Sequence, residues 1–122
     1  MGNKYSIPVI NNNVVRANIF QRELSLTVDS GSDVNLIDKH VFDSLNFQHW
    51  PNNFRQTNDN CLTASGTKLN LIGVVDLPLR VNNKNVMTRF GVVNKLLVPA
   101  ILGQEFFNKN RAIFDFKANV CT

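Results

Sequence analysis

The chain has 122 residues, of which 43% are hydrophobic, and carries a formal net charge of +4. That length and composition describe one globular domain with a single core and exclude a disordered chain. No apolar run is long enough to cross a membrane, and the first residues lack the apolar centre of a signal peptide, so we expect a cytoplasmic (intracellular) protein. The lysines and arginines are scattered rather than gathered in a basic stripe, which disfavours nucleic acid as a partner.

The first half of the chain alternates short β-like runs with turn formers. We interpret residues 1–13 as an N-terminal extension and residues 14–122 as the folded domain. Leu24, Leu26 and Val28 alternate with polar residues, the period-2 pattern of a half-buried strand. The elements expected here are strands at residues 14–19, 24–28 and 34–37, with the polar residues 21–23 between the first two, and a short helix from residue 39 to about 45, capped by Asp38.

The second half contains more short strands around one hairpin. Residues 46–60 form a polar stretch with at most one weak strand. Ser65-Gly66-Thr67 separates two β-like runs at residues 61–64 and 68–75, and Gly66 can adopt the positive φ that a tight turn requires. The run at 68–75 continues as a strand over residues 76–81. The remaining expected elements are strands at 86–93, 98–102, 112–116 and 120–121, a turn at 82–85, and a short helix from 104 to about 108 that aims Phe106 and Phe107 at the core. This pattern predicts a small, closed, mostly β domain with two short helices.

The inventory of reactive side chains excludes several classes of enzyme. His40 and His49 are the only histidines, and neither lies in the context of a serine or cysteine hydrolase. Cys61 and Cys121 are too few for a disulfide framework and lack the spacing of a zinc site. The glycines are isolated, so no phosphate-binding loop is present. We therefore expect neither a metal nor a cofactor.

Asp29 is the unusual carboxylate of this chain. It ends a strand that heads into the core, and the small residues Ser30, Gly31 and Ser32 follow it directly. An acid in such a place is costly unless it is hydrogen-bonded or functional. An Asp that only initiates a turn has the same local sequence, and Asp-Ser-Gly taken alone favours that simpler interpretation.

The order of motifs along the whole chain favours the functional interpretation. The Asp29-Ser30-Gly31 loop is followed by the Gly-tipped hairpin at residues 62–68 and, some 70 residues after Asp29, by Ile101-Leu102-Gly103 at the start of a helix. From about residue 15 to 120 this arrangement resembles the retropepsin-like aspartic proteases, which include retroviral, gypsy-type retrotransposon and Ddi-type proteases. The resemblance implies a small closed β-barrel-like fold with two short helices and a flap hairpin, assembled as a homodimer.

The resemblance also implies a mechanism. Each subunit would contribute Asp29, and the two carboxyl groups would share one proton and hold the water that attacks the peptide bond. The expected activity is that of an aspartic endopeptidase that cleaves extended peptides or polyproteins without metal or cofactor. The implied active-site loop is Ser30 and Gly31, and the implied substrate-binding residues are Ser32, Asp33, Ala64, Ser65, Gly66, Thr67, Ile101 and Leu102. For Leu102 a plain core position is an equal alternative.

The missing Arg partner of Asp33 and an unusual flap keep a second function open. Gln104 stands where retroviral relatives carry the Arg that pairs with the acid at the position of Asp33, and residues 117–122 continue beyond the usual end. The alternative is a catalytically silent, domesticated retropepsin domain that serves as a dimerisation or protein-binding module. The intact Asp29-Ser30-Gly31 favours activity. A nucleic-acid-binding β-barrel would rest on the charge of +4 alone.

Overall fold

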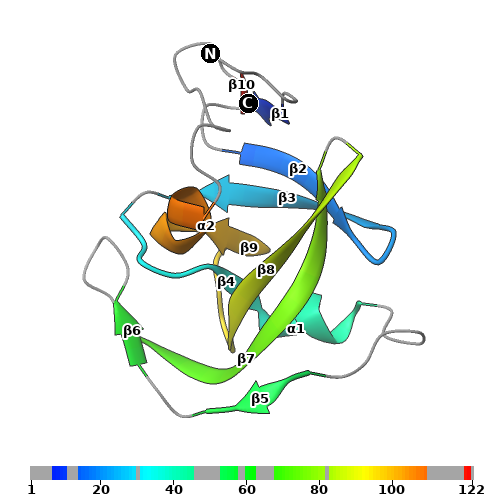
Figure 1. Ribbon diagram of the computed structural model, residues 1–122. Helices are drawn as coiled ribbons and strands as arrows, with labels where there is room; N and C mark the ends of the chain where they lie inside the picture. Colours follow the sequence, from blue (N-terminus) through cyan, green and yellow to red (C-terminus); the bar gives the residue numbers. More distant parts are fainter. Residues whose placement is uncertain are drawn as a thin grey trace.

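Six strands of the computed structural model close into a small mixed barrel (Figure 1). The structure describes residues 7–10, 14–29, 31–45, 53–57, 60–62, 68–81, 83–109 and 120–121. Around the barrel the strands are β2 (Val14–Ile19), β3 (Arg22–Val28), β9 (Ala100–Leu102), β4 (Leu36–Asp38), β8 (Lys84–Val93) and β7 (Lys68–Val81). The β3–β9 and β4–β8 pairs are parallel and the other pairs are antiparallel, and Asn18 on β2 meets Arg80 on β7 to close the ring.

Four shorter strands extend this barrel. β1 (Ile7–Ile10) pairs with β2 and with β10 (Val120–Cys121), while β5 (Arg55–Gln56) and β6 (Asn60–Leu62) both pair with β7. The sequence predicted β10 but not β1. The domain boundary at residue 14 stays a prediction, although the pairing of β1 with β2 joins residues 7–10 to the same sheet.

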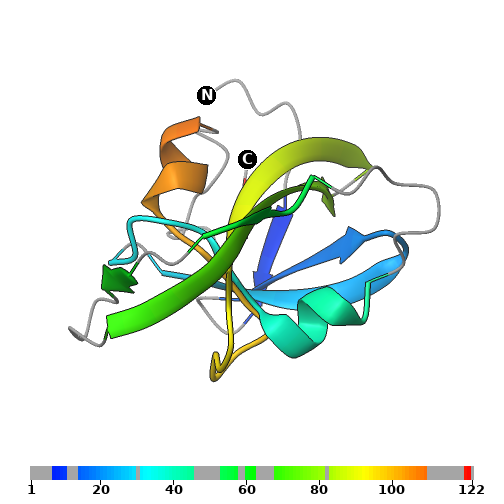
Figure 2. The same ribbon diagram turned by 90° about the horizontal axis from the view of Figure 1, so that it is seen from below.

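The two short helices lie at opposite ends of the antiparallel β4–β9 pair. α1 (Lys39–Asp43) follows β4 directly and α2 (Gln104–Lys109) follows β9, and Figure 2 shows them on opposite sides of the molecule. The N-cap expected for α1 is confirmed, because the Asp38 carboxylate accepts a hydrogen bond of 2.9 Å from the His40 backbone N–H. α1 ends at Asp43, two residues before the predicted end.

Apolar side chains form two clusters on the two faces of the barrel strands. Period-2 alternation sends Ile37 and Leu102 inward, whereas their neighbours Leu36 and Ile101 point to the outer face. We call the second group the outer apolar cluster. It consists of the buried Leu36, Val93 and Ile101 with the partly buried Val34, Leu69, Leu71, Leu96 and Val98. Phe106 of α2 belongs to the inner cluster, as predicted, whereas the Phe107 side chain lies outside what the structure describes.

The β2–β3 hairpin turns one residue earlier than the sequence predicted. Ile19 pairs with Arg22, so Arg22 and Glu23, which were assigned to the connection, already belong to β3. Phe20 and Gln21 form the turn with φ values of 51° and 70°. Two consecutive positive φ values match the twist of a tight hairpin, but Asn-Gly rather than Phe-Gln is the usual sequence signal for them.

β7 is one long strand, as expected from the run at residues 68–75 and its continuation over residues 76–81. A register shift between Leu71 and Gly73 marks an irregularity in its pairing with β8, and β7 then continues to Val81. The Phe54 ring lies over Gly73, where an added Cβ would come within 2.1 Å of the ring. A side chain at position 73 would therefore displace the Phe54 ring from this place.

Some expected elements fall outside the residues that the structure describes. They are the strand at 112–116 and the tip of the hairpin at 63–67. In the described ranges, no helix has the length and apolar character needed to cross a membrane.

Candidate active site

Asp29 lies at the end of β3, where that strand runs parallel to β9. Its backbone N–H donates to the Leu102 carbonyl at 3.0 Å, which extends the β3–β9 ladder by one bond. The Asp29 carbonyl in turn accepts from the Ser32 N–H at 3.1 Å and closes a turn. Both main-chain groups of Asp29 are thus fixed, one by the barrel and one by its own loop.

The same loop orients the Asp29 side chain. The Gly31 N–H donates to Asp29 Oδ1 at 2.9 Å. No described residue donates to Oδ2, and Asp29 is only half-buried. One carboxylate oxygen is therefore fixed by the main chain, while the other is open to a group from outside the chain.

Helix α2 begins directly against this loop and supports it. The Gln104 N–H donates to the Ser32 carbonyl at 2.7 Å, and the Glu105 N–H donates to the Asp33 carbonyl at 3.0 Å. These are helix N-terminal donors that have no partner inside the helix. The loop and the helix thus satisfy each other, and Gly103 lies at the point of contact between them.

Gly103 has no space for a side chain. A Cβ at this position would lie 2.4 Å from the Val34 carbonyl oxygen and 2.5 Å from the Ser32 carbonyl oxygen. Both are main-chain atoms, so they cannot swing away as a side chain would. The sequence placed Gly103 at the start of a helix, and the close approach of the loop backbone explains why this residue must be Gly.

Asn35 is a supporting residue that the sequence analysis missed. Its side chain is 2% exposed, its Oδ1 accepts from the Gly103 N–H at 2.8 Å, and its Nδ2 donates to the Arg89 carbonyl at 3.0 Å. Its own carbonyl accepts from the Gly91 N–H at 2.8 Å. Asn35 thus joins the loop, β8 and the start of α2. The available signal was a single amide in the otherwise apolar run at residues 34–37.

Asn35→Ala is expected to lower the free energy of unfolding by about 2–4 kcal/mol, because it leaves the buried Gly103 N–H and Arg89 carbonyl without partners. Urea denaturation followed by circular dichroism measures this loss. Asn108→Ala, which removes an exposed amide from α2, is the matched control and should change stability by less than about 0.5 kcal/mol. Equal stability of the two variants would contradict the bridging role of Asn35.

Ser32 and Asp33 lie on opposite sides of the loop. Ser32 is 1% exposed, and its hydroxyl donates to the Val34 carbonyl at 2.7 Å. That geometry gives Ser32 a structural role, and its contact with substrate stays a prediction. Asp33 is exposed and forms no ion pair with any described residue.

Ile101 and Leu102 also point to opposite faces. Leu102 is 0% exposed inside the barrel, which is the core alternative considered for it, and Ile101 is 8% exposed in the outer apolar cluster. Val34 of the loop after Asp29 and Ile101 of β9 both belong to this cluster. Of the remaining candidate residues, Ser30, Ala64, Ser65, Gly66 and Thr67 lie outside the described residues.

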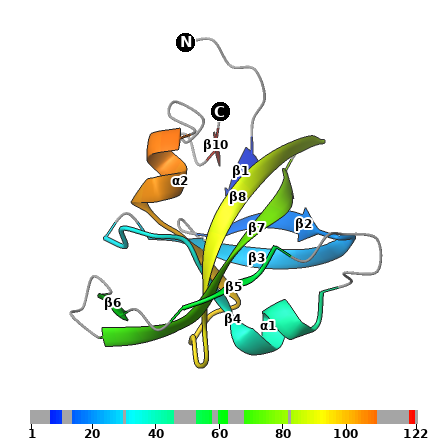
Figure 3. The ribbon, with the colours of Figure 1, turned by 60° about the horizontal axis from the view of Figure 1, so that its bottom comes forward.

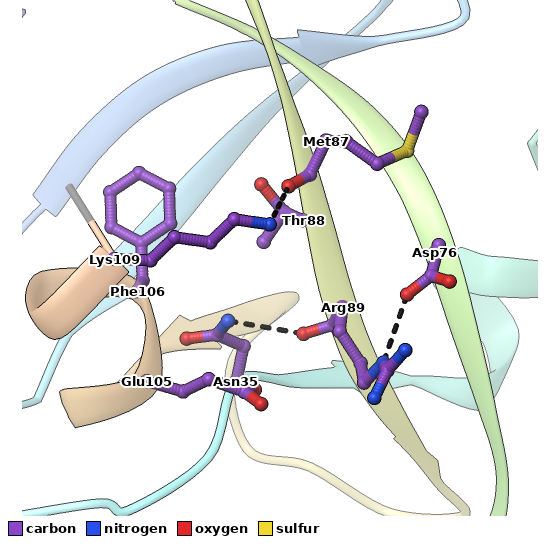
Figure 4. Close-up of a pocket in the computed structure, with 8 residues that line it drawn as sticks. All are labelled: Asn35, Asp76, Met87, Thr88, Arg89, Glu105, Phe106 and Lys109. Atoms are coloured by element: carbon purple, nitrogen blue, oxygen red, sulfur yellow. Dashed lines mark hydrogen bonds and ion pairs between the residues drawn. The ribbon is translucent and has the colours of Figure 1, made fainter.

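A cavity of about 300 Å³ lies between α2 and β8, and Figure 4 shows the side chains around it. Asp29 does not line it. Arg89 Nε donates to Asp76 Oδ1 at 3.0 Å, and Arg55 lies 3.9 Å from the other Asp76 oxygen. The hydrogen bond and the negative charge of Asp76 raise the pKa of the Arg89 guanidinium, so Arg89 remains charged. Opposite charges are already paired here, which is the arrangement of a structural ion-pair network.

Comparison with known proteins supports the fold but not a closer relationship. The sequence matches no protein-family model and no curated protein. The structure is similar to the retroviral protease-like domain of Ddi1 from Leishmania major, with a TM-score of 0.67 and 16% identity over 88% of this chain and 83% of that chain. It is also similar to the EIAV protease, determined in complex with an inhibitor, with a TM-score of 0.62 and 16% identity over 94% of this chain and 98% of that chain.

Within the described part of the chain, no group of three or more His, Cys, Asp or Glu side chains could hold a metal ion.

Proposed function

The chain has a retropepsin-like fold, and from this premise we propose that it is an aspartic endopeptidase whose active site forms between two copies, each contributing Asp29. The substrates proposed are extended peptides or polyproteins. The catalytic chemistry would be the direct attack of a water molecule on the peptide carbonyl, with neither a covalent enzyme intermediate nor a cofactor.

The geometry of the Asp29 carboxylate is the observation that carries this proposal. Gly31 fixes Oδ1 at 2.9 Å, whereas no described residue donates to Oδ2. A second carboxylate brought within about 3 Å could not ionise together with the first, so the pair would share one proton. One carboxyl group then acts as the acid that protonates the substrate carbonyl, and the other acts as the base that takes a proton from water.

The need for a second copy follows from the same chemistry. The loop of one chain aligns one carboxylate in this way, and acid and base catalysis by a dyad requires two. A two-fold axis that passes beside the loop would bring the same residue of a second chain opposite the first. The alternation of roles between two identical groups then needs no other catalytic residue from the chain.

The surroundings of Asp29 support a peptide as substrate. The outer apolar cluster reaches the loop through Val34 and Ile101, and apolar surface of this kind suits the side chains of an extended peptide. The hairpin residues 64–67 are proposed to close over that peptide and to add main-chain hydrogen bonds. Gly31 is proposed to contact the substrate through its backbone.

The test is cleavage of a mixed peptide library by the purified chain between about pH 4 and 7, the range in which carboxyl dyads operate. Cuts in apolar-centred peptides that a statine-containing peptide blocks, but a metal chelator does not, would support the proposal. A chain that forms a stable dimer and cuts nothing over this range would contradict it. The catalytically silent dimerisation or binding module would then be the better interpretation.

A further inference from the structure

A second cavity, of about 400 Å³, carries positive charge and no carboxylate in its lining. It is lined by His40, Lys68, Leu69, Asn70, Val93, Asn94 and Lys95, and we call it the basic pocket. These residues come from the start of α1, the start of β7 and the end of β8 with the residues after it. Three chain segments that are far apart in sequence thus place two lysines and a histidine around one hollow.

Among the described residues, no acid forms an ion pair with the lysines of the basic pocket. Lys68 and Lys95 are exposed, and neither forms an ion pair within the part of the chain that the structure describes. The nearby Asp38 is 9% exposed and uses both oxygens on backbone donors, the N–H groups of His40 and Leu96, each at 2.9 Å. Asp43 is paired with Lys39. The pocket is therefore ready to receive negative charge from another molecule.

The outer apolar cluster connects the basic pocket to the Asp29 loop. Val34 lies beside that loop, and Leu69 and Val93 belong both to the cluster and to the lining of the pocket. Leu97, in the loop between β8 and β9, is fully exposed. Figure 3 shows this loop, in yellow to gold, projecting beside α1 and away from the cyan loop that follows Asp29.

The strand pairing gives the scale of the separation. Asp29 is bonded to Leu102 of β9, and Val93 of the basic pocket lies two strands away through the β9–β4 and β4–β8 pairs, roughly 10 Å across the sheet, and three residues farther along it. Three residues of β-strand span roughly 10 Å, which an extended substrate covers with about the same number of residues. A peptide cut at Asp29 would thus reach the basic pocket about three to five residues from the cut bond.

We propose that the basic pocket binds an acidic segment of the polypeptide substrate, so that the preferred substrates carry Asp or Glu about three to five residues from an apolar cleavage site. This inference rests on the proposed function for the position of the cut. A polypeptide fits better than a nucleic acid because the described lining has no Phe, Tyr or Trp ring for base stacking, whereas Leu69, Val93 and the exposed Leu97 offer apolar contacts.

Binding is measured first, with a variant that does not cut. The full chain carrying Asp29→Asn is titrated into two fluorescent peptides with the same apolar centre, one flanked by an Asp/Glu segment and the other by the matching Asn/Gln segment. Near pH 6, where free Asp and Glu side chains are ionised, the acidic peptide should bind roughly three- to tenfold more tightly. That difference should shrink when the salt concentration rises from about 0.05 to 0.5 M.

Substitutions then test whether the basic pocket causes the difference. Lys68→Gln with Lys95→Gln, added to Asp29→Asn, should bring the ratio of the two affinities to about one. Arg22→Gln with Arg80→Gln is the matched control, since it removes two exposed positive charges that do not line the pocket, and it should keep the ratio. Circular dichroism of each variant confirms that it is folded.

Three results would overturn the inference. They are equal affinity for the two peptides, a preference that survives the Lys68 and Lys95 substitutions, and displacement of the acidic peptide by inorganic phosphate or an oligonucleotide of equal charge at the same concentration. Cleavage by the wild type is scored separately. Equal cleavage of both peptides would contradict the binding of acidic segments in the basic pocket but support the peptidase. Selective binding without any cleavage would support the binding of acidic segments but contradict the peptidase.

Discussion

Asp29→Asn is expected to lower the rate of peptide cleavage by roughly a thousandfold or more while the barrel stays folded. An amide has nearly the shape of the carboxylate, and its oxygen can still accept the hydrogen bond from the Gly31 N–H. The amide has neither an acidic proton that it can share with a second carboxyl group nor a negative charge with which to activate water. The loss should therefore appear in kcat rather than in the affinity for substrate.

The control for this variant is Asp43→Asn, which also removes one negative charge but from the exposed face of α1, where Asp43 pairs with Lys39. Its rate should remain within about twofold of the wild type, because an exposed i,i+4 pair contributes little to stability. Initial rates on one cleaved library peptide give both values. Similar rates for the Asp29 and Asp43 variants would show that Asp29 is not catalytic.

Gly103→Ala is expected to lower the free energy of unfolding by about 2–4 kcal/mol. The added Cβ would lie 2.4 Å and 2.5 Å from two main-chain oxygens, those of Val34 and Ser32. Either the loop or the start of α2 must move, and both movements stretch the hydrogen bond from the Gln104 N–H to the Ser32 carbonyl. Cleavage should fall as well, since the same loop orients Asp29.

Gly91→Ala is the matched control for this change. There the added Cβ would lie 2.7 Å from a Leu71 methyl carbon and 3.2 Å from a Leu36 methyl carbon, and both can rotate away. Urea midpoints of the two variants and the wild type measure the difference. A Gly103→Ala protein as stable as Gly91→Ala would contradict the tight packing of the loop on α2.

The parts of the fold that the sequence predicted are those set by local patterns. Alternation along residues 24–28 corresponds to β3, and Asp38 caps α1 as its position suggested. The position of the turn at Phe20 and Gln21 was predicted incorrectly, because neither residue is typical of turn positions with a positive φ. β1 was missed because a strand of four residues is specified by its partners, β2 and β10, rather than by its own sequence.

The same distinction holds for the candidate site. Asp29, Gly31 and Gly103 follow from motifs at a recognisable spacing, and the contacts of Gly103 explain why that motif contains a glycine. Asn35 could not be predicted in the same way, because its partners come from β8 and α2 and meet only after nonlocal pairing. The basic pocket has the same origin, since its three segments are brought together only by the fold.

Mixing the wild type with Asp29→Asn tests most directly whether two copies share one active site. Chains that exchange at random form mixed dimers with a single Asp29, and these should be inactive. A threefold excess of the variant should therefore reduce cleavage per wild-type chain to roughly a quarter, whereas extra wild type should not reduce it. Cleavage per wild-type chain that is unchanged by the variant, after full exchange, would contradict a site built from the Asp29 residues of two chains.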